Sequence, residues 1–304
     1  MNSDKPLVSL CITCYNQEKY IREAVQSAFD QTYSPLEIII CDDCSKDRTP
    51  EIIEEMIADY RAHGGKHSVV FKRNEKTLNV IFNYMQAFKM GRGELLVTGS
   101  GDDVSVPSRV ALIVREWIKA EKIPTEIIHG RDNIDTNGNI VGEEGPRPPI
   151  EPLGACMAYR RDVITAFPDP VIGNAYEDMI YGARAYIMGE PLRLQDHLLK
   201  YRIGGTTSGF GEDRKRWFAA VKREFDSHEQ LEMDFAYAKG KWSDERVEMV
   251  ASADRARRDR TLLRYQHEIK LSTQVKRRFL RLAGVVCNLI HIHPMRMLRR
   301  LRCR

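Results

Sequence analysis

Apolar runs of strand length alternate with amphipathic segments of helix length through the first 120 residues of the chain. The runs are nearly continuous in hydrophobic residues, as in buried strands, whereas the segments between them repeat apolar positions every three or four residues. The predicted strands are 7–13, 36–41, 68–72 and 94–98, and the predicted helices are 18–31, 51–62, 79–90 and 109–120. Strands that alternate with helices predict βαβ units with right-handed crossovers. This part of the chain is therefore predicted to be a doubly wound α/β fold with a mostly parallel sheet.

The rest of the chain shows weaker patterns that change character near residue 210. Short strands are predicted at 126–130 and 154–159, a hairpin around Asn137-Gly138, a proline-marked loop at 146–149, and helices at 162–167 and 177–189. The segment 212–270 is charged, and its apolar positions recur at helical spacing, which predicts two or three helices. We therefore expect an α/β domain at 1–208 and a helical, basic C-terminal extension at 209–304.

The composition places the chain among ordinary globular proteins. It has 304 residues, of which 42% are apolar and 30% charged, with a net charge of +4. Its seven scattered cysteines are typical of a reducing cytoplasm rather than of a disulfide framework. The N-terminal residues do not have the pattern of a signal peptide, and no apolar run approaches the roughly 20 residues that span a bilayer.

Positive charge is concentrated at the C-terminal end. The segment 270–304 contains ten Lys and Arg residues and no Asp or Glu, and 275–292 combines basic with apolar residues. Such a basic amphipathic helix is typical of a protein that lies on an anionic membrane surface. Nucleic-acid binding is a competing use, but aromatic residues are sparse here, and we expect no nucleic-acid partner. A helix packed on the rest of the protein is the remaining alternative.

Two pairs of adjacent carboxylates follow predicted strands. Asp42 and Asp43 end the second strand, and Asp102 and Asp103 follow the fourth in the stretch LLVTGSGDDVSVP. In a parallel sheet both pairs should lie at the same edge, where ligands of α/β proteins bind. Neighbouring carboxylates repel each other, and Mg²⁺ is commonly held by one or two carboxylates together with substrate phosphates. The alternative is that Asp102 and Asp103 only cap the helix that begins near Ser108.

Two further motifs in the sequence are typical of other kinds of site. The cysteines of CITC (11–14) and CDDC (41–44) have zinc-like spacing, but both pairs border strand-like runs and lack the glycines of zinc knuckles, which favours small buried cysteines. Gly99 and Gly101 form a GxG, but Val104 stands at the third glycine position and the motif follows the fourth strand, which argues against a nicotinamide enzyme.

The ordered set of motifs carries a family resemblance. The run VSLCITCYNQEKYIREAVQSAFDQTYSPLEIIICDDCSKDRTPEII, followed by GRGELLVTGSGDDVSVPSRV, resembles the inverting nucleotide-sugar glycosyltransferases of family 2, which have the GT-A fold. The resemblance covers about 7–205. It implies that 1–208 is a GT-A glycosyltransferase catalytic domain.

The resemblance also implies roles for individual residues. The segment from Thr13 to Asn16 would approach the nucleotide, Asp43 would hydrogen-bond the base, and Asp102 would lie near the ribose. Asp103 would ligate Mg²⁺ or Mn²⁺, and the acidic pair at the start of the predicted helix 177–189 would supply the catalytic base. The implied set is Thr13, Tyr15, Asn16, Asp43 and Asp102 for the nucleotide sugar, Asp103 for the metal, and Asp178 as base with Glu177 as the second choice. Helix-dipole stabilisation is the structural alternative for the last pair.

The chain departs from the family pattern at two places. Cys44 replaces the glycine of the usual DDGS, and Phe82 and Asn83 stand where an arginine-asparagine pair is often found before the fourth strand. The second change leaves the diphosphate contact open, with Lys76 or Arg73 as substitutes.

The resemblance implies a metal-dependent, inverting glycosyltransferase that moves a sugar from a nucleoside diphosphate to an acceptor hydroxyl. Such enzymes commonly build bacterial surface polysaccharides or lipid-linked glycans, and the basic tail suits a cytoplasmic protein peripheral at the inner membrane face. A non-catalytic nucleotide-sugar binder or scaffold with the same fold is the main alternative. A sugar-phosphate nucleotidyltransferase is a further one, but 13–19 lacks the Gly-rich, basic loop that it needs after the first strand.

Overall fold

The computed structural model describes residues 5–147, 154–204 and 214–271, and the chain divides into two compact units, Met1–Asp254 and Arg255–Arg304. The strands are β1 (Val8–Cys14), β2 (Leu36–Asp42), β3 (Ser68–Arg73), β4 (Leu95–Ser100), β5 (Val104–Ser105), β6 (Glu126–Ile134), β7 (Ile140–Glu144), β8 (Met157–Arg160) and β9 (Pro191–Arg202). The helices are α1 (Ile21–Phe29), α2 (Thr49–Ala62), α3 (Val80–Met90), α4 (Arg109–Lys119), α5 (Arg161–Thr165), α6 (Glu177–Met188), α7 (Arg214–Ala238) and α8 (Asp244–Leu271), with a 3₁₀ turn at Gly154–Cys156.

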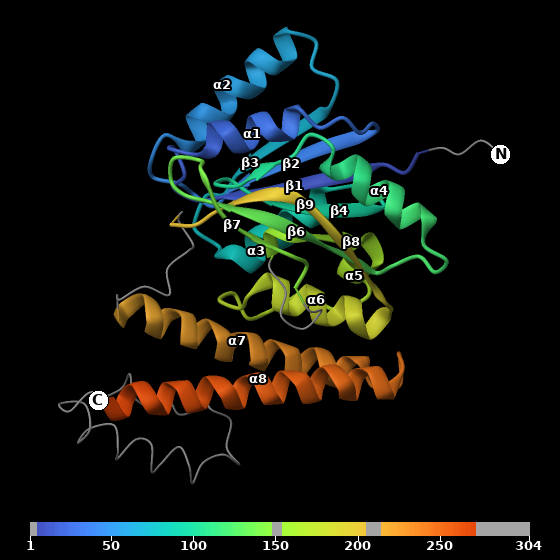
Figure 1. The fold of residues 1–304 in the computed structure, drawn as a ribbon, viewed down its shortest axis with the longest axis vertical. Coiled ribbons are helices and arrows are strands. Elements are labelled where there is room, and N and C mark those ends of the chain that lie inside the picture. Colours follow the sequence, from blue (N-terminus) through green and yellow to red (C-terminus); the bar gives the residue numbers. More distant parts are fainter. Residues whose placement is uncertain (1–4, 148–153, 205–213, 272–304) are drawn as a thin grey trace. The chain divides into compact units, whose positions relative to one another are not determined.

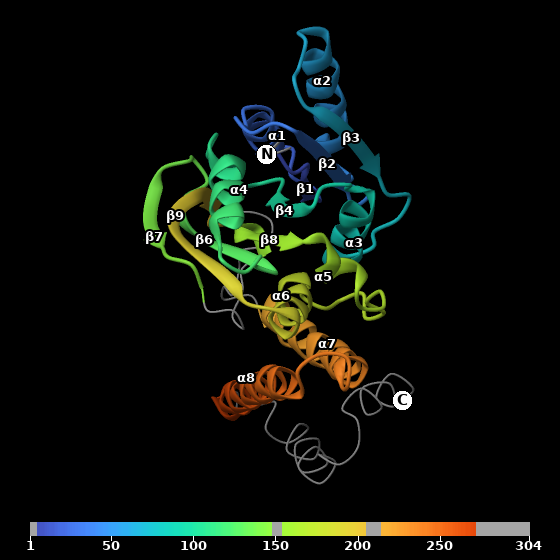
Figure 2. The same ribbon diagram turned by 90° about the vertical axis from the view of Figure 1, so that its right-hand side faces the viewer.

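All nine strands of the first unit belong to one sheet (Figures 1 and 2). The order is β3-β2-β1-β4-β8-β6-β9-β5, and β7 pairs with β6 outside this path. Strands β3, β2, β1 and β4 are parallel, β8 is antiparallel to both of its neighbours, and β6 and β9 run parallel to each other. The predicted α/β fold with a helical C-terminal region is confirmed. The sheet is parallel over β3, β2, β1 and β4, as predicted, but mixed as a whole, because four of its eight strand pairs are antiparallel.

The central strands are buried because helices cover both faces of the sheet. Alternate residues of β1 enter different cores: Leu10 and Ile12 belong to the core under α1, α2 and α4, whereas Cys11 belongs to the core under α3, α5 and α6. Leu231 and Phe235 of α7 extend the second core. Figure 1 shows α1 and α2 on one side of the sheet and α6 and α7 on the other. Burial on both faces explains why these strands have continuous apolar sequences.

Most predicted elements are present, with differences in their bounds. The predicted strand 154–159 begins with the 3₁₀ turn Gly154–Cys156 and is a strand only from Met157, in β8. The segment 18–31 is helical only over α1, and the predicted strand 126–130 continues to Ile134, where it enters the predicted hairpin with Gly138 at φ +87° in its turn. Strands β5 and β9 were not predicted. Burial of the four CxxC cysteines is confirmed. The segment 275–292 and the boundary at 208/209 lie outside the described residues.

None of the described helices combines the length and the apolar character needed to cross a membrane.

Candidate active site

The two aspartate pairs lie at the same edge of the sheet, one on each side of the end of β1. Cys14 is in register with Asp42 of β2, and Thr13 is in register with Ser100 of β4. The backbone continues this pairing past the strands, because Asp43 N donates to Cys14 O at 2.9 Å and Gly101 N donates to Thr13 O at 3.0 Å. The predicted convergence of the two pairs is therefore confirmed.

Only one of the two carboxylate oxygens of Asp103 has a hydrogen-bond partner among the described residues. Its Oδ1 accepts a hydrogen bond from Arg202 N at 2.9 Å, whereas its Oδ2 is buried and has no partner among the described residues. Burial, and then the neighbouring Asp102, raise the pKa of the Asp103 carboxyl well above its usual range. A divalent cation would supply both the missing partner and the compensating charge, so the donor set fits a hard metal ion.

The aspartates do not cap α4, so the capping alternative is wrong. The helix begins after Ser108 and has no side-chain cap. Asp102 instead accepts a hydrogen bond from Ser100 Oγ within its own loop.

Arg202, at the end of β9, fixes the loop that carries these aspartates. It is 2% exposed, and its Nε donates to Asp102 O at 2.9 Å. The same guanidinium pairs with Glu23 at 2.8 Å and lies over the ring of Tyr20, 4.5 Å from its centroid. Arg202 therefore ties the acidic loop to the segment that follows β1.

The pair after β2 differs from the pair after β4 because donors from the chain itself satisfy it. Asp42 is fully buried and accepts hydrogen bonds from Ser45 N and Ser45 Oγ. Asp43 Oδ1 accepts from Asn74 Nδ2 at 3.0 Å and Leu78 N at 2.7 Å, and its Oδ2 accepts from the backbone at 79 at 3.0 Å. These contacts hold Asp43 against the loop 74–79, and its contact with a base remains a prediction.

Cys44 occupies a backbone conformation that favours glycine. Its φ is +64°, in the left-handed region, which accounts for the glycine that the family pattern has here. The Cys44 thiol is buried, accepts from Lys46 Nζ at 3.0 Å, and contacts Glu75 O at 3.6 Å.

The predicted nucleotide residues lie at the end of β1 and directly after it, at the edge of the sheet that carries the two aspartate pairs. Thr13 is buried and hydrogen-bonds Tyr84, while Tyr15 is 40% exposed. Asn16, at φ +51°, accepts from Lys46 N at 2.8 Å and so links this segment to the loop after β2. An exposed aromatic ring beside a fixed polar loop is suited to contact a nucleotide.

Glu177 and Asp178 form the first turn of α6 and differ in their surroundings. Asp178 is half-buried, and its carboxylate accepts from Gly154 N at 3.0 Å and from Met179 N at 2.8 Å. Glu177 is buried, and burial, with Asp178 beside it, raises its pKa to about 8. Gly154 packs so closely on Glu177 that a Cβ there would lie 2.2 Å from Oε1. The more accessible Asp178 is thus the better placed to contact a substrate.

The structure distinguishes the two candidates for the diphosphate contact, Arg73 and Lys76. Asn83 is buried and bridges Asn74 and Cys41 O. Arg73 donates to Ser45 O and pairs with Asp42. Of the two basic candidates, Lys76 is therefore the one that is exposed and has no partner among the described residues.

Arg131 of β6, which is 5% exposed, was not among the predicted site residues. Its Nε and Nη1 have no partner among the described residues, its Nη2 pairs with Glu144 at 2.9 Å, and its charge acts on Asp103. The available signal was weak, because Arg131 stands among other polar residues after the apolar start of the strand.

Comparison with known proteins shows what the chain is similar to. Residues 9–140 match the family model described as glycosyl transferase family 2. An uncharacterized glycosyltransferase of Nostoc sp. is 27% identical over 220 residues, which are 66% of each chain. The chondroitin synthase of Escherichia coli is 34% identical over 136 residues, which are 45% of this chain and 19% of the synthase. The chain thus spans less than two thirds of either relative.

One solved structure extends the similarity in fold to nearly the whole chain. The mannosyltransferase PcManGT from Pyrobaculum calidifontis, in complex with GDP-Man and Mn²⁺, superposes with a TM-score of 0.57 at 15% identity, covering 95% of this chain and 89% of that one.

Proposed function

We propose that the chain, whose residues 9–140 match glycosyl transferase family 2, transfers a sugar from a nucleoside-diphosphate sugar to an acceptor hydroxyl, with inversion at the anomeric carbon. One observation carries the proposal: Asp103 presents a buried carboxylate oxygen without a partner, next to Asp102, at the edge of the sheet where the nucleotide segment lies. A carboxylate left in this state costs stability unless a ligand uses it.

A divalent cation, Mg²⁺ or Mn²⁺, would be held by Asp103. When bound, such an ion stabilises the negative charge on a leaving diphosphate. The Mn²⁺ in the mannosyltransferase complex supports this assignment. Thr13, Tyr15 and Asn16 would contact the nucleotide together with Asp43 and Asp102.

Asp178 is the proposed general base. An acceptor hydroxyl becomes a good nucleophile when a carboxylate removes its proton, and a positioned base contributes roughly 10²–10⁴-fold. Asp178 is half-buried and held by two backbone N–H groups, whereas Glu177 is 8% exposed and faces Gly154. One-step attack on the face opposite the diphosphate inverts the anomeric centre and needs no nucleophile from the protein.

The proposed acceptor is a glycan or lipid-linked glycan of a bacterial surface polysaccharide. The similarity to a chondroitin synthase supports a polysaccharide product. The basic, acid-free sequence of 270–304 supports a peripheral location at the inner face of an anionic membrane. Replacement of Arg277, Arg278 and Arg281 with glutamine should then reduce sedimentation with anionic vesicles and leave transfer to a soluble acceptor unchanged.

The donor site is tested first, by calorimetric titration with UDP, GDP and dTDP, each with and without Mn²⁺. We expect Mn²⁺-dependent binding of one nucleotide by the wild type and loss of that binding in Asp103→Ala. Asp59→Ala removes an exposed carboxylate on α2 and serves as the matched control. If no nucleotide binds, or if Asp103→Ala binds like the wild type, the donor-site assignment fails.

Turnover separates an enzyme from a scaffold. Asp178→Asn should keep the nucleotide affinity and lose transfer. A wild-type protein that binds the nucleotide but transfers no sugar to any tested acceptor would favour the non-catalytic binder.

A further inference from the structure

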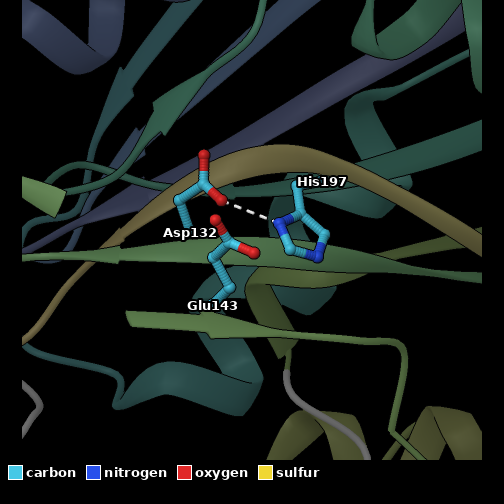
Figure 3. A group of neighbouring side chains, drawn as sticks. All are labelled: Asp132, Glu143 and His197. Atoms are coloured by element: carbon cyan, nitrogen blue, oxygen red, sulfur yellow. Dashed lines mark hydrogen bonds and ion pairs between the residues drawn. The ribbon is translucent and has the colours of Figure 1, made fainter. Parts of the chain in front are cut away.

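Three potential metal ligands meet on the sheet, each from a different strand. Asp132 lies on β6, Glu143 on β7 and His197 on β9, and their ligand atoms all lie within 4.8 Å of one another. Figure 3 shows the three side chains pointing toward one another across the strands. No such group of three or more was found elsewhere in the described part of the chain.

The strand register places two like charges directly opposite each other. Asp132 and Glu143 are Cα partners in the antiparallel pair β6–β7. Like charges in this position destabilise a sheet. Within the described residues neither carboxylate pairs with a lysine or an arginine, and the Glu143 side chain has no hydrogen bond. The hairpin therefore concentrates negative charge, and among the described residues His197 is the basic side chain that pairs with it.

Irregular pairing of β6 with β9 brings the histidine to this position. His197 is the partner of Gly130, and the register shifts on both sides of that pair. A β-bulge of this kind redirects a side chain and is common beside functional sites. Gly130 also leaves room for the ring, because a Cβ there would lie 2.5 Å from His197 Cδ2. The imidazole Nδ1 then lies 2.7 Å from Asp132 Oδ1.

We propose that Asp132, Glu143 and His197 form a binding site for a divalent transition metal of the zinc class, independent of the cation proposed at Asp103. One imidazole nitrogen and two carboxylates suit Zn²⁺, which is commonly held by three protein ligands and a water, whereas Mg²⁺ and Ca²⁺ prefer oxygen ligands alone. Glu143 is exposed and can rotate toward the ion.

The site differs in position from the Asp103 site. Side chains alternate along β6, so Arg131 and Asn133, which contact Glu144, point away from the face that carries Asp132. The ion would tie the edge strand β7 to β6 and β9. Because Glu144 of β7 pairs with Arg131, whose charge acts on Asp103, the ion would stiffen the wall of the candidate active site.

The test uses the full-length protein, freed of metal with a chelator and titrated with Co²⁺ and with Zn²⁺. Co²⁺ that is bound by a small number of ligands, such as three protein ligands and a water, absorbs visible light. The absorption therefore measures metal binding without any activity assay. We expect a saturable Co²⁺ spectrum that Zn²⁺ displaces at one equivalent. Glu143→Gln and His197→Ala should weaken the affinity by at least about 100-fold, since even loss of an indirect partner costs 10–100-fold.

Three controls make the result specific. His63→Ala removes an exposed histidine that lies 3.3 Å from Asp59 and has no third ligand, and it should leave the spectrum unchanged. The double variant His291→Ala/His293→Ala tests the other histidine pair and should also bind like the wild type. Asp103→Ala should keep the Co²⁺ site even where it loses the nucleotide, so the two proposals fail separately.

Other outcomes overturn the proposal. It fails if the wild type gives no saturable spectrum, if Glu143→Gln retains wild-type affinity while its circular dichroism shows a folded protein, or if either histidine control abolishes the signal.

Discussion

Replacement of Glu177 with glutamine is expected to stabilise the protein at alkaline pH and to change its stability little at acidic pH. The Glu177 side chain is 8% exposed, and burial, followed by the charge of Asp178, raises its pKa from 4.5 to about 8. The fold therefore favours the protonated carboxyl, which glutamine imitates. As the pH rises from about 4.5 through about 8, the unfolded chain releases this proton more readily than the folded chain, so wild-type stability falls across that window.

The size of the effect follows from the shift. One pKa unit corresponds to 1.36 kcal/mol, so the full shift of Glu177 gives about 5 kcal/mol as an upper limit. Part of the shift comes from the charge of Asp178 and not from burial alone, and the expected gain for Glu177→Gln at pH 9 is therefore about 2–4 kcal/mol.

The assay is urea unfolding of both proteins from pH 5 to pH 9, with the variant-minus-wild-type difference plotted against pH. The difference should be near zero at pH 5 and grow toward pH 9. Glu54→Gln, on the exposed face of α2, should give a flat difference. A flat difference for Glu177→Gln, or a variant that is less stable than the wild type at pH 9, would refute the reasoning.

The remaining predictions concern the backbone and the active site. Asp178→Asn should lower kcat for sugar transfer by roughly 10²–10⁴-fold with an unchanged nucleotide Kd, measured by steady-state kinetics and calorimetry. Cys44→Gly should be neutral or stabilise by up to about 1 kcal/mol, whereas Cys44→Val should destabilise by about 1–3 kcal/mol, because φ +64° is least favourable for a β-branched residue; thermal unfolding measures both. Arg202→Lys keeps the charge but loses the hydrogen bond to Asp102 O, so it should destabilise by about 2–4 kcal/mol and weaken Mn²⁺-dependent nucleotide binding. A wild-type affinity in a folded Arg202→Lys protein would contradict the positioning role.

The sequence predicted the strands whose own residues form a clear pattern and missed the strand whose position depends on distant parts of the chain. Strands β1, β2 and β4 are buried on both faces, so their apolar runs identified them directly. Strand β9 reads PLRLQDHLLKYR, and its irregular pairing with β6 places polar residues such as His197 out of a simple alternation. Its place in the sheet comes from pairing with a strand about sixty residues earlier in the chain, which a local pattern does not reveal.

The same reasoning explains what was found and missed at the site. The sheet topology brought Asp43 and Asp103 to one edge, because parallel neighbours end together. The partners of those residues were not predictable: Arg202 N donates to Asp103 across 99 positions of the chain, and Asn74 donates to Asp43 across 31. Hydrogen bonds of this kind depend on the final packing of loops, about which a single sequence says little.

Hydrogen bonding distinguishes the carboxylates after β2, which donors from the chain satisfy, from the Asp103 carboxylate, which keeps one oxygen without a partner among the described residues. Asp42 and Asp43 are both buried, but Ser45, Asn74 and the backbone of 78–79 donate hydrogen bonds to them, and these contacts stabilise the loops around β2. Asp103 has the same burial and a like-charged neighbour, yet keeps one oxygen without a partner. A fold selected only for stability would have an uncharged side chain at this position. Asn83 is an example of such a side chain, since it is buried and bridges two neighbours by hydrogen bonds. The unsatisfied oxygen of Asp103, beside Asp102 at the end of the parallel strands, therefore supports the proposed ligand, a cation that carries a diphosphate.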